Sequence, residues 1–361
     1  MANRPVIVVE DDPFTRLIPI VLDPTSSEER RAAFADFMAH DEPDFDGWIA
    51  RVRAGAGSLS PADVRLVASE SEMRANLADA VVLVTESLWV GPDDLAAAPR
   101  LKAVQKFGLG LRNIDAAAVK AKGVKLLTIR RRANIACAEH AFALMLMLAR
   151  KLDLMNGMVS KQRFEAAGFP VRPYDRRHVP GGNYGRVPGT RSLHGATIGI
   201  IGLGEIGREI ALRASAFGMR VLYHQRTRSP ESEERELNAS YAPMATLLAE
   251  SDWIMPQVPT TPATRDLIGQ AELSQIKPSA CIVSVSNALV INKDAVTEAL
   301  HSGRLAGFAL DTMYQEPMPD GDPLLHLDNV VLTPRMAGSP RFNGLDDFEE
   351  LITTLAREVR S

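Results

Sequence analysis

The sequence predicts an α/β protein in which short aliphatic strands alternate with helices along most of the chain. Strand-like runs such as VIVV (6–9), AVVLV (80–84) and VKLLTI (124–129) are separated by polar, helix-rich segments. One longer segment, TIGIIGLGEIGREIALRASAFGMRVLYHQRTR (197–228), places strand, glycine-rich turn, helix and strand in succession. Apolar residues make up 46% of the chain and aromatic residues only 6%, which fits an aliphatic core. These three observations favour parallel sheets covered by helices on both faces.

Size, charge and cysteine content narrow the class of protein. A chain of 361 residues is typical of two domains. The net charge of −4 does not indicate a nucleic-acid or membrane partner. The longest apolar run, AFALMLMLA (141–149), is well short of the ~20 residues that a membrane span needs. Cys137 and Cys281 both lie in apolar runs, so we expect no disulfide framework and a cytoplasmic, reducing location.

Two consecutive segments in the middle of the chain have contrasting character. Residues 133–156 are apolar on nearly every side, which predicts a long buried helix. Residues 157–195 are rich in Gly, Pro and Arg, and 161–191 holds seven Lys or Arg against two acids. A structureless stretch of this length is typical of a functional loop or an arm that grips a partner. A solvated surface loop is the alternative interpretation.

The segment 197–228 carries the most specific local motif, GxGxxG between a strand and a helix. Gly202 permits the tight turn, Gly204 lets the backbone approach a pyrophosphate, and Gly207 lets the helix pack against the strand. The free N–H groups and the dipole at the start of the helix favour phosphate. The motif predicts dinucleotide binding, and a purely structural turn is the alternative.

The end of the second strand in this segment bears on cofactor choice. An acidic residue about 20 positions after the glycines would hold the ribose hydroxyls of NAD. Here Gln225 occupies that place and is followed by Arg226 and Arg228. No carboxylate repels a 2′-phosphate, and two guanidinium groups can pair with it. The pattern favours NADP over NAD, unless the arginines are only solvated surface charges.

Further segments complete a resemblance to a known family. In chain order they are LKAVQKFGLGLRNID (101–115), ANIACAEHAF (133–142), DWIMPQVPTTPATRDLIG (252–269), IKPSACIVSVSNALVINKDAVTEAL (276–300), GRLAGFALDTMYQEP (303–317) and NVVLTP (329–334). With the glycine motif, they make the chain resemble the D-2-hydroxyacid dehydrogenase family over nearly its whole length.

The resemblance implies a division of the chain into two domains. Residues 1–130 and 335–361 would form a flavodoxin-like substrate-binding domain. A Rossmann-type doubly wound parallel sheet, residues 131–334, would be inserted in it and bind NADP or NAD. The nicotinamide would lie in the cleft between them. The resemblance also implies a homodimer formed through the cofactor domain.

The resemblance assigns three catalytic positions, and two of them hold unexpected residues. The family uses an Arg to anchor the substrate, a His as general acid–base and a Glu to tune the His. The Glu position is Glu316, the Arg position is Asn287 and the His position is Arg335. Arginine stays protonated at ordinary pH, so Arg335 cannot exchange a proton but can grip an anion.

Other residues are candidates for the missing acid–base role. Glu316 can act directly if burial raises its pKa. Lys106 faces the cleft in the family layout and is a candidate proton donor or anion anchor. Tyr314 and His140 are further candidates, although a satisfied core histidine is the interpretation that we favour for His140.

Further cofactor contacts follow from the resemblance and from the charge pattern. The resemblance places Glu205, Ile206, Pro259, Ser286 and Asp311 at the cofactor, with Gln257 on the same loop as Pro259. Arg130, Arg131 and Arg132 lie at the inferred hinge, where Arg130 and Arg132 share a face of an extended chain. They can clamp an anion or remain solvated. No metal site is predicted.

Three functions from different classes remain open at this point. The first is an NAD(P)-dependent oxidoreductase with a non-standard active site that acts on an anionic small molecule. The second is an enzyme with tightly held NAD(P) and no net redox change, such as a hydratase, lyase or dehalogenating enzyme. The third is a non-catalytic nucleotide-sensing protein. Turnover of NADPH with 2-oxo acids would favour the first function. Cofactor that co-purifies with the protein would favour the second, and cofactor binding without turnover would favour the third.

Overall fold

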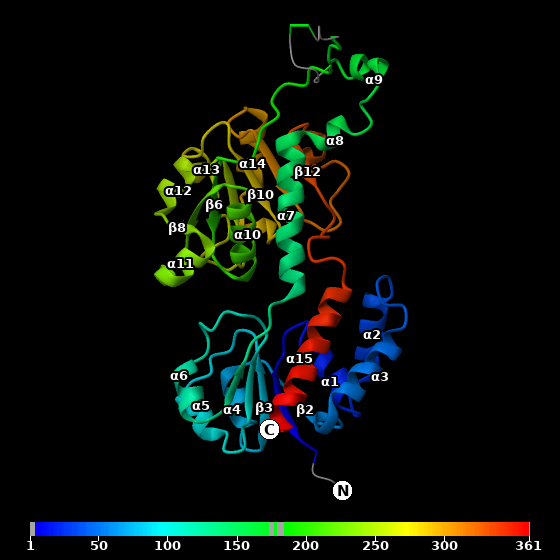
Figure 1. The fold of residues 1–361 in the computed structure, drawn as a ribbon, viewed down its shortest axis with the longest axis vertical. Helices are drawn as coiled ribbons and strands as arrows, with labels where there is room; N and C mark the ends of the chain where they lie inside the picture. The colour runs from blue at the N-terminus through cyan, green and yellow to red at the C-terminus, as the bar shows by residue number, and fades with distance from the viewer. Residues whose placement is uncertain (1–3, 173–176, 179–183, 361) are drawn as a thin grey trace. The chain divides into compact units, whose positions relative to one another are not determined.

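Two compact units make up the protein (Figure 1). The computed structural model describes residues 4–172, 177–178 and 184–360. Unit 1 comprises Met1–Ala136 and Gly338–Ser361, and unit 2 comprises Cys137–Ala337. The sequence prediction placed the same two limits at residues 131 and 334. Each unit contains one parallel sheet, which confirms the predicted α/β class.

The sheet of unit 1 has five strands in the order β2-β1-β3-β4-β5, all parallel. This is the flavodoxin-like order. The strands are β1 (Val6–Glu10), β2 (Asp63–Val67), β3 (Ala80–Thr85), β4 (Ala103–Lys106) and β5 (Lys125–Leu127). The helices are α1 (Leu17–Leu22), α2 (Glu28–Met38), α3 (Phe45–Gly55), α4 (Glu70–Ala75), α5 (Pro92–Ala97), α6 (Ala116–Ala121) and α15 (Phe342–Arg360), with the 3-10 turn η1 (Gly57–Leu59).

Helices cover both faces of the unit 1 sheet. Buried side chains of α1, α3 and α15 form one core with β1 and β3, and those of α4, α5 and α6 form another. Figure 1 shows α15, the last helix of the chain, in unit 1, where it packs against α3 and β4. Phe348 of α15 stacks on Phe107, with 4.9 Å between the ring centroids. The C-terminal residues therefore complete a core that the N-terminal residues begin.

The sheet of unit 2 has seven parallel strands in the order β12-β11-β10-β9-β6-β7-β8. Counted from β6, this is the doubly wound dinucleotide-binding order with one added strand. The strands are β6 (Thr197–Ile201), β7 (Arg220–His224), β8 (Ala239–Tyr241), β9 (Trp253–Pro256), β10 (Cys281–Ser284), β11 (Gly307–Leu310) and β12 (Val330–Leu332). The α-helices are α7 (Arg132–Arg150), α8 (Leu152–Met155), α9 (Lys161–Ala166), α10 (Glu205–Ala216), α11 (Glu231–Leu237), α12 (Met244–Glu250), α13 (Gln270–Leu273) and α14 (Lys293–His301), and the first residues of α7, up to Ala136, belong to unit 1. The 3-10 turns are η2 (Ala288–Val290) and η3 (Pro323–His326).

Two cores cover the faces of this second sheet. One contains α7 and α10, and the other contains α12, α13 and α14. The predicted single helix over 133–156 is wrong at its C-terminal end. Helix α7 ends at Arg150 because Lys151 adopts a left-handed φ of 52°, and the short α8 follows. Among the described residues, no helix is long and apolar enough to cross a membrane.

The described part of the segment 157–195 contains more regular structure than its composition suggests. Residues 161–166 form α9, capped by the side chain of Ser160, so the expectation of a structureless stretch is wrong there. A bridge joins Val171 to Gly185. The remainder of that prediction falls in part on residues 173–176 and 179–183, which lie outside the described residues.

Candidate active site

The glycine turn between β6 and α10 has the geometry of a dinucleotide cradle. Gly202 has a φ of +100°, and a Cβ there would lie 2.5 Å from the carbonyl oxygen of Gln257. A Cβ on Gly207 would lie 2.3 Å from the carbonyl oxygen of Gly202. At Gly204, in contrast, a Cβ would meet no atom within 4 Å. The fold itself needs Gly202 and Gly207, whereas Gly204 leaves open the space that a pyrophosphate approaches.

The loop after β9 presents polar atoms without partners beside this turn. Both amide atoms of the Gln257 side chain and the hydroxyl of Thr260 are buried and make no hydrogen bond to any described residue. Buried polar groups nearly always have hydrogen-bond partners, so the absence of protein partners here indicates a ligand or water. These residues fit a dinucleotide, which brings its own donors and acceptors. Pro259, predicted on the same loop, is exposed there.

The polar residues after β7 differ in the hydrogen bonds and ion pairs that they form within the protein. Gln225 accepts a hydrogen bond from the Leu203 N–H at 3.3 Å and donates one to the Ser229 hydroxyl at 2.9 Å. Arg228 pairs with Glu234 at 2.7 Å. Hydrogen bonds from Arg228 and from a tyrosine lower the pKa of Glu234 to about 2. Arg228 is therefore already neutralised within the protein.

Arg226 differs from its neighbour. It is exposed, and no described residue pairs with it. Of the two arginines that the sequence assigned to a 2′-phosphate, the structure thus leaves Arg226 available. The remaining predicted contacts are local: Glu205 and Ile206 open α10, and the Ser286 hydroxyl donates to the carbonyl oxygen of Pro256 at 2.7 Å.

A buried carboxylate organises the chain after β12. Asp311 accepts hydrogen bonds from the Thr333 hydroxyl at 2.6 Å and from the N–H groups of Met336 and Ala337 at 2.8 and 2.9 Å. Nε2 of His140 lies 2.9 Å from the Thr333 hydroxyl and 3.3 Å from Asp311. Burial opposes ionisation of Asp311, but these hydrogen bonds outweigh it and lower its pKa. His140 belongs to this network, so it is a satisfied histidine, as the sequence analysis favoured.

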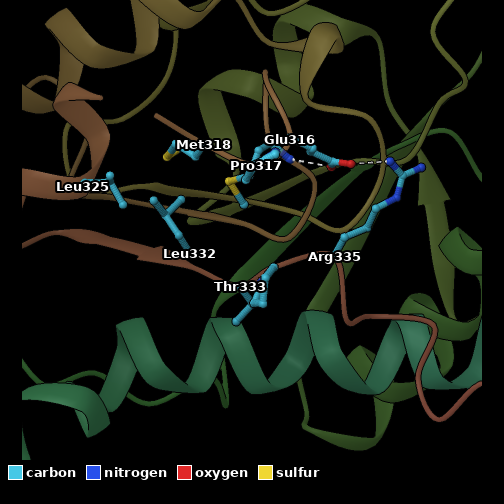
Figure 2. Close-up of a pocket in the computed structure, with 9 residues that line it drawn as sticks. Glu316, Pro317, Met318, Leu325, Leu332, Thr333 and Arg335 are labelled. Atoms are coloured by element: carbon cyan, nitrogen blue, oxygen red, sulfur yellow. Dashed lines mark hydrogen bonds and ion pairs between the residues drawn. The ribbon is translucent and has the colours of Figure 1, made fainter. Parts of the chain in front are cut away.

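Arg335 lies within the segment that Asp311 holds. It adopts a left-handed φ of 57°, which is uncommon outside glycine, and its N–H donates to the carbonyl oxygen of Asp311 at 2.7 Å. Its side chain is 69% exposed. Nη1 lies 2.6 Å from Oε2 of Glu316, the ion pair marked in Figure 2. Among the described residues, Nε and Nη2 of Arg335 have no acceptor.

The pKa of Glu316 is lowered, whereas a carboxyl that transfers a proton near neutral pH would need a raised one. The hydrogen bond from Arg335 lowers its pKa, and its other oxygen accepts from the N–H of Met313 at 3.1 Å. Direct proton transfer by Glu316 was conditional on a raised pKa, so that part of the sequence interpretation is wrong. The pair instead holds a guanidinium group in one orientation at the surface of unit 2.

Asn287 has a local structural role, and Tyr314 is largely buried. The Asn287 side chain accepts from the N–H of Leu289 at 3.0 Å and caps η2. The Tyr314 hydroxyl is buried without a hydrogen-bond partner in the described part of the chain, and burial raises its pKa. Neither group supplies a charge at neutral pH.

An apolar cavity lies next to the ion pair, within unit 2. Its volume is about 390 Å³. Figure 2 shows Leu325, Leu332 and Met318 on one side of it and Arg335 on the other. Sequence reasoning missed this cavity because η3 and the loop before it contribute most of the wall.

Unit 1 contains a second group of charged residues, at the carboxyl end of its sheet. Lys106, the last residue of β4, is only 5% exposed, and its Nζ donates to the carbonyl oxygen of Glu86. Burial raises the pKa of the Glu86 carboxyl. Arg131 lies over the ring of Phe107 at 4.4 Å, and its Nε is buried without a hydrogen-bond partner among the described residues.

The predicted clamp by Arg130 and Arg132 is not what the structure shows for Arg132. Its guanidinium pairs with Asp347 and Glu350 of α15, at 2.9 and 2.8 Å. Glu86 is the residue that sequence reasoning missed in this region, whereas Arg131 was already named as part of the hinge cluster. Glu86 could have been found from its position directly after a parallel strand, where ligand sites gather.

Comparisons with known proteins agree with this geometry. Residues 142–337 match the family described as D-isomer specific 2-hydroxyacid dehydrogenase, NAD binding domain. The chain is 35% identical to the glyoxylate reductase of Korarchaeum cryptofilum (strain OPF8) over 258 residues, 70% of this chain and 72% of that one. It is 36% identical to the glyoxylate reductase of Pyrococcus furiosus (strain ATCC 43587 / DSM 3638 / JCM 8422 / Vc1) over 255 residues, 71% of each. The apo form of Rhodotorula graminis D-mandelate dehydrogenase shares the fold, with a TM-score of 0.56, 22% identity, and coverage of 98% of this chain and 93% of that one.

Proposed function

Because the chain belongs to the D-isomer specific 2-hydroxyacid dehydrogenase family, we propose that this NAD(P)-dependent oxidoreductase reduces 2-oxo acids and uses Arg335 to bind the substrate carboxylate. The observation that carries the proposal is the exposed guanidinium of Arg335, which Glu316 engages through Nη1 alone, whereas Glu234 engages Arg228 through both Nε and Nη2. Asp311 holds the backbone of Arg335 and Glu316 orients its side chain. Glyoxylate, the substrate named in relatives about 35% identical, is the simplest member of this class.

The distribution of charge in unit 2 supports an anion site at Arg335 rather than at Asn287. Asn287 is neutral and caps η2. Arg335 keeps Nε and Nη2 available while Nη1 is paired with Glu316. A planar guanidinium binds a carboxylate through two parallel hydrogen bonds, which a point charge does not provide.

The cradle at Gly204 and the unpaired polar atoms of Gln257 and Thr260 are the proposed contacts of the dinucleotide. When bound, the nicotinamide supplies the hydride that reduces the carbonyl carbon. Arg226 is the proposed contact of a 2′-phosphate, which favours NADPH. Arg335 binds the substrate and Glu316 orients Arg335; neither exchanges a proton with the substrate, because arginine stays protonated and the ion pair lowers the pKa of Glu316. The substrate oxygen that becomes the hydroxyl would take its proton from water.

The direct test measures NADPH consumption with glyoxylate, pyruvate and hydroxypyruvate. Arg335→Lys is expected to raise KM about tenfold (~1.4 kcal/mol) with a smaller effect on kcat, because a point charge replaces a fork. Arg235→Ala is the matched control, since Arg235 forms an exposed ion pair with Glu231 elsewhere in unit 2. Unchanged KM and kcat in Arg335→Ala would contradict the assignment of Arg335.

A second variant tests the non-standard site as a whole. Asn287→Arg combined with Arg335→His restores the family pattern. It is expected to change the preference among 2-oxo acids and to introduce a pH dependence near the pKa of histidine. Cofactor that co-purifies and is not consumed with any acid would instead support a reaction without net redox change. Binding without any turnover would support a sensor.

We also propose a homodimer formed through α7 and the segment 157–195. Apolar side chains in and after α8 are exposed, with Leu152 46% and Val159 74% accessible. Covering them against a second copy would remove this area from water. Light scattering should give about twice the chain mass of 39.3 kDa, and a clean monomer would contradict the assembly. A cytoplasmic location stays a prediction.

A further inference from the structure

The cavity beside Arg335 has an apolar wall and a charged rim. Six apolar side chains line it: Met313, Pro317, Met318, Leu325, Leu332 and Pro334. The other lining residues are Glu316, Thr333 and Arg335. The cavity therefore adjoins the guanidinium that we assign to the substrate carboxylate, and both lie within unit 2 (Figure 2).

The polar groups at the rim already have partners on the side of the protein. The Thr333 hydroxyl is bound to Asp311, and Glu316 is paired with Arg335. An apolar ligand group can therefore enter the cavity without removing water from an unpaired polar atom of Thr333 or Glu316. Away from Arg335, a polar group entering the cavity would lose water without finding a free side-chain donor or acceptor among the described lining residues, which costs free energy.

The apolar wall of the cavity can adapt to ligand groups of different shape. Met313 and Met318 are flexible, polarisable side chains that fit varied shapes. Leu325 is 46% exposed, which leaves apolar surface in contact with water. A volume of about 390 Å³ falls in the range of small-molecule pockets. Glyoxylate carries no side chain and would leave the cavity unfilled.

We propose that this cavity binds the side chain of the substrate, so that the preferred substrate is a 2-oxo acid with an aliphatic or aromatic side chain rather than glyoxylate. This inference rests on the proposed function, because it needs Arg335 to hold the carboxylate. With the carboxylate at Nε and Nη2 of Arg335, the side chain enters the cavity between Met318 and Leu332. Burial of each methylene then strengthens binding of the substrate.

The first experiment is a series of 2-oxo acids with NADPH: glyoxylate, pyruvate, 2-oxobutanoate, 2-oxohexanoate and phenylpyruvate. We expect kcat/KM to rise along the linear members, by up to about fourfold for each methylene (~0.8 kcal/mol). A flat or falling series, with glyoxylate still reduced, overturns this inference and leaves the proposed function intact. No turnover of any member contradicts the proposed function itself.

Two variants test the position of the side chain. Leu325→Trp fills the cavity from a half-exposed position and should lower the ratio of kcat/KM for 2-oxohexanoate to that for pyruvate at least tenfold. Met318→Ala enlarges the cavity and should shift the preference toward phenylpyruvate. The control is Phe342→Trp, an exposed apolar residue of unit 1, which should leave the ratio unchanged.

Another occupant of the cavity is excluded by the same variants. If the cavity receives a side chain of a second copy of the protein, Leu325→Trp will change the mass measured by light scattering and leave the ratio between long and short acids as in the wild type. That outcome overturns the inference. Retained mass with an altered ratio supports it, and Met318→Ala decides the case if Leu325→Trp does not fold.

Discussion

In each unit, a buried carboxylate at the carboxyl end of the sheet accepts hydrogen bonds from backbone N–H groups of a loop. The two carboxylates lie at different places in the strand order. In unit 1, Glu10 ends β1, and its carboxylate accepts hydrogen bonds from the N–H groups of Glu86, Ser87 and Leu88, at 2.6, 2.8 and 3.0 Å. In unit 2, Asp311 follows β11 and holds the segment after β12 in the same way. Burial opposes ionisation of both carboxyls, yet the hydrogen bonds lower both pKa values.

The difference lies in where each carboxylate sits in the strand order. The order of unit 1 reverses between β1 and β3, the point where flavodoxin-like sheets bind ligands, and Glu10 occupies that point with a side chain of the protein. The order of unit 2 reverses between β6 and β9, and there Gly204 leaves open space. Asp311 lies between β11 and β12 instead. The buried carboxylate of unit 1 therefore occupies the point where its sheet would bind a ligand. The buried carboxylate of unit 2 lies away from that point and leaves it open.

Replacing either carboxylate by its amide should give the largest effect. Glu10→Gln and Asp311→Asn each remove a charged acceptor from several buried donors, which should cost about 2–3 kcal/mol of unfolding free energy. Urea unfolding followed by tryptophan fluorescence measures it. Trp48 and Trp89 report on unit 1, and Trp253 reports on unit 2.

The controls separate a structural from a functional loss. Glu28→Gln, on the exposed side of α2, should leave stability unchanged. Asp311→Asn should also lower kcat/KM, because it loosens the segment that carries Arg335. Wild-type stability in both amide variants would show that these hydrogen bonds are not what holds the two loops.

A side chain at the open cradle should have the next largest effect. Gly204→Ala should leave the unfolding transition unchanged but weaken NADPH binding at least tenfold (~1.4 kcal/mol), because the methyl group enters the space of the pyrophosphate. Gly202→Ala is the contrasting variant and should destabilise unit 2, since its Cβ would strike the Gln257 backbone. Fluorescence titration and thermal unfolding measure the two effects. Unaltered NADPH affinity in Gly204→Ala would place the cofactor elsewhere.

A smaller effect is expected at the ribose end of the same cradle. Arg226→Ala should raise the Kd for NADPH by several-fold and leave that for NADH unchanged, because an exposed charge pair contributes about 0.2–1 kcal/mol. Arg228→Ala should discriminate less between the two cofactors, since Glu234 already neutralises Arg228. A native preference for NADH above tenfold would contradict the assignment.

The smallest expected effect is one of pH, because protonation leaves both carboxyl side chains in place. Their pKa values are lowered in the folded state, so their stabilisation is present above the ordinary values of 4.5 for Glu10 and 3.8 for Asp311. It is lost as pH falls through the lower folded values. The urea midpoint should therefore decrease in acid, less steeply in Glu10→Gln. Equal slopes in variant and wild type would argue against the shift.

The sequence by itself determined the features that depend on neighbouring residues. The strands, the glycine turn and the order of motifs are local patterns, and they were enough to predict two parallel sheets and a dinucleotide cradle. Gly202 and Gly207 illustrate the reason. Their requirement comes from backbone geometry within one βαβ unit, which the motif encodes directly.

Only the tertiary structure decided which charged residues form ion pairs and in which direction their pKa values shift. Arg226 and Arg228 look alike in sequence, but Glu234, folded back by α11, neutralises one of them. The pKa of Glu316 is lowered because the chain after β12 returns Arg335 to within 2.6 Å of it, although 19 positions separate them. A pKa depends on burial and on neighbours in space, and sequence distance does not report either.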